Sequence, residues 1–174
     1  GAVTFREDWM EHRLNCLKNF GIVDQEHVVW VGGNAKMNEF QAAMGLCNLH
    51  HLDQEIDRRR LVVERYLSGL AGVPGIKLPS FREGLTPNYA YFPVLFEDFK
   101  ADRDQVYDCL AGHRIYPRKY FYPLINDFQC YKGRFSSKDT PVAAYVADRV
   151  LTLPCYADLE LEDVDRICGI IRGM

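Results

Sequence analysis

The sequence has little that would suit a membrane or a nucleic acid. Its 174 residues carry 21 basic and 24 acidic side chains, for a formal net charge of −3. This near balance leaves no basic excess to attract a nucleic acid or an acidic lipid surface. Apolar runs such as residues 28–31 and 90–96 are far shorter than the ~20 residues that span a bilayer. No signal-peptide pattern opens the chain, so we expect a cytoplasmic protein that binds neither membrane nor nucleic acid.

Metal-binding and common nucleotide-binding patterns are also absent. The chain has no GxGxxG, Walker loop or serine-hydrolase elbow. His50 and His51 lie in a helical pattern without a third ligand at a suitable spacing. The cysteines form no CxxC pair, so we expect buried free thiols in a reducing compartment and no metal site. The six are Cys16, Cys47, Cys109, Cys130, Cys155 and Cys168.

One long helix is the strongest feature of the hydrophobic pattern. Residues 38–72 have helical periodicity, with an apolar stripe that includes Phe40, Met44, Cys47, Leu49, Leu52, Ile56, Val63, Tyr66 and Leu70. Asn38, with Gln41 three residues later, is typical of a capping box at a helix start. Such a helix is about 45 Å long at ~1.5 Å per residue and usually links two parts of a structure.

Shorter elements flank this helix. Residues 1–5 are typical of the end of a strand, which would make the chain a fragment, and residues 6–20 follow a helical pattern closed by Gly21. After Gly75, strands and helices alternate, which indicates a small α/β unit. The pattern predicts strands over 76–78, 89–96 and 150–153, helices over 102–114, 141–150 and 161–172, an extended stretch over 115–120 and a loop over 121–140.

Two segments are candidates for binding. Gly32-Gly33-Asn34 and Lys36 directly precede the long helix, and glycine backbone, a lysine and a helix N-terminus all favour a phosphate. An ordinary turn is the alternative for the same residues. The second segment, Arg118-Lys119-Tyr120-Phe121-Tyr122-Pro123-Leu124, combines two cations with three aromatic rings. It indicates a binding loop, or alternatively an aromatic loop packed on the core.

In order along the chain, these segments resemble the C-terminal half of the DegT/DnrJ/EryC1/StrS sugar aminotransferases. The resemblance rests on residues 1–3, 18–22, 33–43, 115–124, 151–156 and 162–167. It implies an α/β fold of the aspartate-aminotransferase kind (fold type I). Residues 1–37 would end the large cofactor-binding domain, residues 38–72 would form a linking helix, and residues 73–174 a small C-terminal α/β domain.

The resemblance implies an enzyme that uses pyridoxal 5′-phosphate to transfer an amino group from glutamate to a nucleotide-linked keto-sugar. The Arg-Lys-Tyr-Phe-Tyr-Pro stretch most resembles members that act on dTDP-4-keto-6-deoxyhexoses. In this family the Schiff-base lysine lies upstream of the segment that resembles Gly1-Ala2-Val3. We therefore expect no catalytic residue in this chain, and no activity without the missing N-terminal segment.

Individual residues also match the family. Asn34 matches the asparagine that reaches across a homodimer to the cofactor phosphate of the neighbouring subunit, and Lys36 beside it would face that phosphate or the sugar nucleotide. Arg118, Tyr120 and Tyr122 match the region that lines the substrate cleft. Two alternatives stay open. One is a dehydratase of the same family, in which histidine usually replaces the Schiff-base lysine. The other is a non-catalytic sugar-nucleotide-binding or regulatory module.

Overall fold

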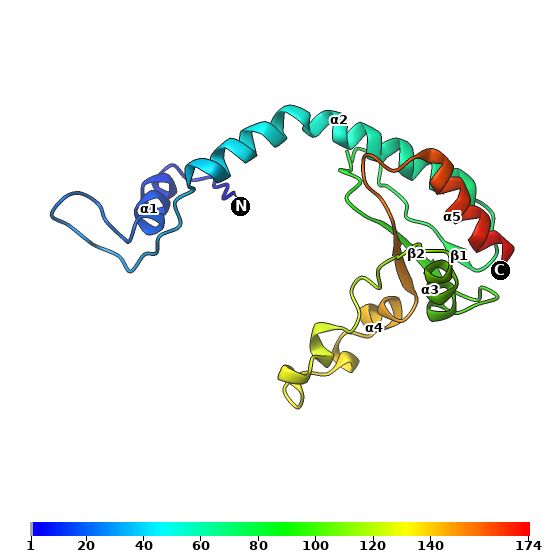
Figure 1. Cartoon of the computed structure of the whole chain (residues 1–174). Coiled ribbons are helices and arrows are strands. Elements are labelled where there is room, and N and C mark those ends of the chain that lie inside the picture. Colours follow the sequence, from blue (N-terminus) through cyan, green and yellow to red (C-terminus); the bar gives the residue numbers. More distant parts are fainter. Residues whose placement is uncertain (1) are drawn as a thin grey trace. The chain divides into compact units, whose positions relative to one another are not determined.

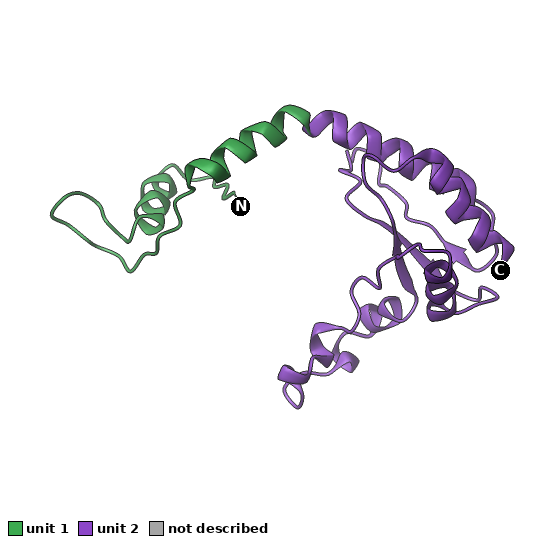
Figure 2. Cartoon of the chain, viewed as in Figure 1, with its two compact units in different colours: residues 1–51 green, residues 52–174 purple. Residues whose placement is uncertain are grey.

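The chain folds into two compact units that share one helix. The computed structural model describes residues 2–174; the first unit comprises residues 1–51 and the second residues 52–174 (Figure 2). The division falls inside helix α2 (Glu39–Leu70), which begins in the first unit and ends in the second. The expected division at residues 37 and 72, which treats this helix as a separate part, stays a prediction.

The first unit is built on helix α1 (Trp9–Lys18) and the chain that returns to its C-terminal end. The amide of Gly33 donates to the carbonyl of Leu17 at 3.0 Å, and the amide of Ala35 donates to Lys18 at 2.9 Å. Gly32 makes this contact possible, because a Cβ there would lie 2.4 Å from the amide nitrogen of Gly21. The returning segment is therefore held by backbone hydrogen bonds.

The strand predicted at the start of the chain is wrong for the part that the structure describes. Residues 2–5 form no regular element, and Gly1 lies outside the described residues. A strand needs a hydrogen-bonded neighbour, and none pairs with these residues within 2–174.

Helix α2 begins as its sequence predicts. The Asn38 side chain accepts the amide of Gln41 at 2.9 Å, and the Gln41 side chain accepts the amide of Asn38 at 3.1 Å, which completes the capping box. The apolar stripe is buried only in the second unit, where Val63, Tyr66 and Leu70 lie in the core. In the first unit the same stripe is exposed. Its exposed members there are Phe40, Met44, Cys47 and Leu49.

The second unit contains a three-stranded antiparallel sheet in the order β1-β2-β3. The middle strand pairs Phe92 with Leu153 on one side and Phe96 with Ile76 on the other. Arg118 adds a single antiparallel bridge to Thr152 of β3, within the stretch predicted to be extended. The strands are β1 (Ile76–Lys77), β2 (Phe92–Phe96) and β3 (Val150–Leu153).

Helices cover this sheet, and α5 runs beside the second half of α2 (Figure 1). Arg65 of α2 donates two hydrogen bonds of 2.6 Å to Asp165 of α5. A capping box between Asp102 and Gln105 starts α3, one residue from the helix start that the sequence predicts. The helices are α3 (Arg103–Gly112), α4 (Pro141–Ala147) and α5 (Leu161–Gly173). The predicted 121–140 loop contains three 3-10 turns, Ile125–Asp127, Gln129–Tyr131 and Ser137–Asp139.

The core of the second unit lies between α2, the sheet, α3 and α5. Tyr66 of α2 stacks on Phe92 of β2, with ring centroids 4.8 Å apart and planes 14° apart. Cys168 is buried in this core, and Cys16 is buried in the first unit. The prediction of buried thiols fails for Cys130 as well as for the cysteine on α2, because both lie on exposed surfaces.

Two further findings concern membranes and metals. Among residues 2–174, no helix combines the length and the hydrophobicity needed to cross a bilayer. Within those residues, no three His, Cys, Asp or Glu side chains gather in a way that could hold a metal ion.

The buried hydroxyl of Tyr66 gives a test of the core. It has no hydrogen-bond partner among the described residues, and burial raises its pKa strongly. Tyr66→Phe removes this unpaired group and keeps the ring, so the free energy of unfolding should stay the same or rise by up to about 1 kcal/mol. Tyr66→Ala, which also removes the ring, should cost about 3–5 kcal/mol. Urea unfolding of the three proteins measures both effects. A clear loss of stability in Tyr66→Phe would contradict a core in which this hydroxyl has no partner.

Candidate functional site

The first candidate region is a hollow in the first unit, which we call the Asn34 hollow. Its volume is about 840 Å³, and both predicted residues, Asn34 and Lys36, line it. Both are exposed. The remaining lining comes from the following residues and the start of α2: Ala35, Met37, Phe40, Gln41, Met44, Gly45 and Asn48.

The two polar residues of this hollow are held differently. The Lys36 ammonium donates to the side-chain oxygen of Asn19 at 2.7 Å and lies 4.5 Å from the centre of the Phe20 ring. The side-chain amide of Asn34 has no hydrogen-bond partner within residues 2–174, although its backbone bridges to Asn19. The hollow therefore presents one oriented cation and one amide that is available to a ligand.

Two backbone amides beside the glycines are already used within the first unit. The amides of Gly33 and Ala35 donate to α1, and Gly32 is required for that close approach. These two amides are therefore not free for an anion in the hollow, and helix α2 begins only at Glu39. The role of the glycine backbone at a phosphate stays a prediction.

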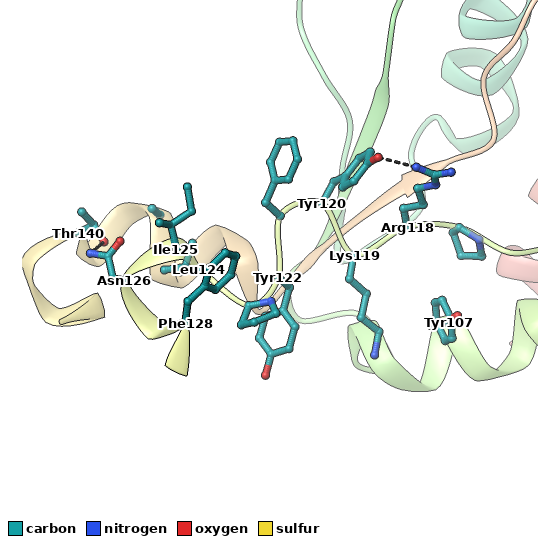
Figure 3. Close-up of a pocket in the computed structure, with 14 residues that line it drawn as sticks. Tyr107, Arg118, Lys119, Tyr120, Tyr122, Leu124, Ile125, Asn126, Phe128 and Thr140 are labelled. Carbon is teal, nitrogen blue, oxygen red and sulfur yellow. Dashed lines mark hydrogen bonds between the residues drawn. The ribbon is translucent and has the colours of Figure 1, made fainter. Parts of the chain in front are cut away.

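The second candidate region is a cleft in the second unit with a volume of about 980 Å³. The predicted segment 118–124 forms much of its wall (Figure 3). Arg118 donates to the hydroxyl of Tyr120 at 2.5 Å, and the Tyr120 ring lies edge-on to Tyr91 with centroids 5.5 Å apart. Arg118 and Tyr120 also line a neighbouring hollow of about 410 Å³, which we call the tyrosine hollow. Its other tyrosines are Tyr91, Tyr116 and Tyr156.

Helix α3 holds the same segment through its first turn. Asp104 Oδ1 lies 2.6 Å from the Lys119 ammonium and 2.6 Å from Arg103 Nε. The second contact is an ion pair without hydrogen-bond geometry, because this Nε has no hydrogen-bond partner among the described residues. Arg103 is 4% exposed, donates to the Ala147 carbonyl at 2.8 Å, and lies 4.6 Å from the centre of the Tyr122 ring. Lys119 first, and then Arg103, hold the pKa of the Asp104 carboxyl below its ordinary value.

The structure thus groups the predicted residues by unit. Arg118, Tyr120 and Tyr122 meet at one cleft, whereas Asn34 and Lys36 line a hollow of the other unit. Sequence reasoning did not select Arg103, Asp104 or the tyrosines other than Tyr120 that line the tyrosine hollow. The capping box fixes where α3 begins, but no spacing in the sequence indicates that its first turn contacts residue 119.

With this geometry in place, comparison with known proteins identifies the family. The chain belongs to the DegT/DnrJ/EryC1/StrS aminotransferase family, whose model matches residues 1–172. It is 40% identical to the dTDP-4-amino-4,6-dideoxy-D-glucose transaminase of Escherichia coli, over 99% of this chain and 47% of that protein. The chain therefore spans about half the length of the curated relatives that it matches.

Solved structures agree with this assignment. DesV of S. venezuelae, in complex with a ketimine intermediate, matches with a TM-score of 0.85 and 31% identity, over 96% of this chain and 44% of that one. The PLP form of Spr1654 from Streptococcus pneumoniae matches in fold, with a TM-score of 0.84 at 24% identity, over 95% of this chain and 43% of that one. The family and the fold class predicted from the sequence are confirmed.

The carboxylate of Asp104 gives a test of how the cleft is held. Asp104→Asn should lower the free energy of unfolding by up to about 1 kcal/mol at neutral pH, because the Asp104 side chain itself is more than half exposed. The pKa of folded Asp104 lies below the unfolded value of about 3.9. The stabilisation is therefore complete above that value and is lost as the pH falls through the folded pKa.

Urea unfolding between pH 7 and pH 3 measures this effect. The difference between wild type and Asp104→Asn should shrink below about pH 4. Asp108→Asn, an exposed position on the same helix, serves as the control. A difference of constant size down to pH 3 would contradict a role for the ionised carboxylate.

Proposed function

We propose that this chain is part of a pyridoxal 5′-phosphate-dependent aminotransferase that moves an amino group from glutamate to a nucleotide-linked keto-sugar. We further propose a dTDP-4-keto-6-deoxyhexose as the acceptor. The observation that carries the proposal is the 40% identity, over nearly all of this chain, to a protein named as a dTDP-4-amino-4,6-dideoxy-D-glucose transaminase. The roles assigned to residues 1–37, 38–72 and 73–174, and the cytoplasmic location, stay predictions.

The Asn34 hollow fits the phosphate of the cofactor. A neutral amide donor beside an oriented ammonium group can bind a phosphate without backbone amides. Asn34 would reach the cofactor phosphate of the neighbouring subunit in a homodimer, as the family resemblance implies, with Lys36 facing the same phosphate or the sugar nucleotide. Bound pyridoxal phosphate supplies the electron sink for amino transfer. The Schiff-base lysine would come from the N-terminal segment of the longer polypeptide.

The cleft of the second unit fits an anionic, hydroxyl-rich substrate. Arg118 is exposed and, within the described residues, forms no ion pair with a carboxylate. Its guanidinium can therefore bind a phosphate oxygen of a nucleotide sugar. The phenol groups of Tyr120 and its neighbours offer flat apolar faces together with polar hydroxyl groups.

The reaction type can be tested by spectroscopy on the full polypeptide that contains these residues. We expect a visible absorbance band from bound pyridoxal phosphate, bleached by glutamate and restored by the keto-sugar. A band that glutamate leaves unchanged, together with loss of water from the sugar, would indicate the dehydratase. Sugar-nucleotide binding without any band would indicate a binding module. Either result would overturn the proposed transamination.

The role of Asn34 can be tested by substitution in the same full polypeptide. Asn34→Ala should weaken pyridoxal phosphate binding about tenfold or more, since hydrogen bonds to charged groups contribute about 1.5–3 kcal/mol. Asn34→Asp keeps the shape but adds a negative charge, so it should weaken binding further. Asn15→Ala, at an exposed position on α1, is the control. Titration of the apoenzyme with the cofactor gives the affinities; equal values for all four proteins would exclude Asn34 from the phosphate site.

A further inference from the structure

The first turn of α3 contacts the 118–124 segment at two points. Asp104 pairs with Lys119, and Arg103 lies against the ring of Tyr122. We propose that Arg103 and Asp104 are positioning residues, which hold this segment so that Arg118 and Tyr120 face the nucleotide-sugar substrate. This inference rests on the proposed function and adds to it two residues that do not themselves touch the substrate.

The backbone around residue 118 explains how one contact bears on its neighbours. The amide of Arg118 donates to the Thr152 carbonyl at 3.0 Å, and the amide of Thr152 donates to the Arg118 carbonyl at 2.8 Å. The Arg118 carbonyl also accepts the amide of Tyr120 at 3.0 Å, which closes a tight turn around Lys119. The Lys119 ammonium pairs with Asp104 of α3, while Arg118 and Tyr120 line the tyrosine hollow. Fixing Lys119 to α3 thus holds the turn that presents its two neighbours.

The distribution of charge supports the same division. Three cations, Arg103, Arg118 and Lys119, lie near the cleft, and the carboxylate of Asp104 pairs with two of them. Arg118 instead donates to the neutral hydroxyl of Tyr120. Its positive charge is not compensated by a carboxylate in the described part of the chain. Arg118 is therefore the cation of this cleft that an anionic substrate can pair with.

The position of Tyr122 changes the role expected for it. Its ring lies against the guanidinium of Arg103, which is itself 4% exposed and hydrogen-bonded to α4 through the Ala147 carbonyl. A cation held over an aromatic ring contributes about 0.5–2 kcal/mol. Tyr122 thus anchors the segment to α3, and the substrate contact passes to Arg118 and Tyr120.

The test uses the full polypeptide with its cofactor and compares Asp104→Asn, Lys119→Met and the double variant. Each single variant should raise the KM for the nucleotide sugar about fivefold to tenfold. The kcat, the KM for glutamate and the absorbance of bound cofactor should change less than twofold. Because the two residues act through one contact, the double variant should be no worse than either single variant. Asp104→Glu should restore part of the loss, and Asp108→Asn should behave as wild type.

A second measurement does not depend on activity. Limited trypsin digestion with mass spectrometry reports cleavage after Arg118, a site that all of these variants keep. Cleavage there should be several times faster in Asp104→Asn and Lys119→Met than in wild type and Asp108→Asn. Unchanged cleavage and an unchanged KM for the sugar would overturn the positioning role. An inactive wild type with faster cleavage in the variants would instead refute the proposed function and keep the positioning role.

Discussion

The stacking of Tyr66 on Phe92 is the contact on which the second unit depends. It joins the buried half of α2 to β2, and β2 is the middle strand of the sheet. Aromatic pairs of this kind contribute about 0.5–1.5 kcal/mol beyond the burial of their surface. Because β2 pairs with β3, and Thr152 of β3 pairs with Arg118, the position of the 118–124 segment follows from this core contact through two sets of backbone hydrogen bonds. The cleft is thus set on the most buried part of the chain.

Elements with local chemical signals could be predicted from the sequence. The capping boxes at Asn38 and Asp102 fix the starts of α2 and α3, and α5 follows from apolar residues at helical spacing. Residues 2–5 show the limit of this reasoning, because strand formation depends on a partner that local sequence does not specify. Phe40 shows another, since it continues the apolar stripe of α2 but is 89% exposed in this chain. Periodicity identifies an apolar face without identifying what covers it.

The candidate site could be predicted in the same partial way. The composition of residues 118–124 was sufficient to select that segment, since loops on a rigid scaffold commonly carry binding residues and arginine can bind a phosphate. Its supports were not predictable, because Asp104 and Lys119 meet only through the packing of α3 against the cleft. The glycines before α2 show that a signal in the sequence can have a second use. The amide of Gly33 donates to α1, and the polar side chains of Asn34 and Lys36 line the hollow.

One electrostatic pattern is common to the two candidate regions. In each, a cation is oriented by a neutral oxygen: Lys36 by the amide oxygen of Asn19, and Arg118 by the hydroxyl of Tyr120. A carboxylate in either place would orient the cation equally well but would also neutralise it, as Asp104 does for Lys119. A neutral acceptor fixes the direction of the charged group at a smaller electrostatic cost to an incoming anion. Lys119 and Arg118, which are adjacent in sequence, therefore differ in their partners. The charge of Lys119 is paired with a carboxylate, whereas that of Arg118 has only a neutral hydroxyl partner among the described residues.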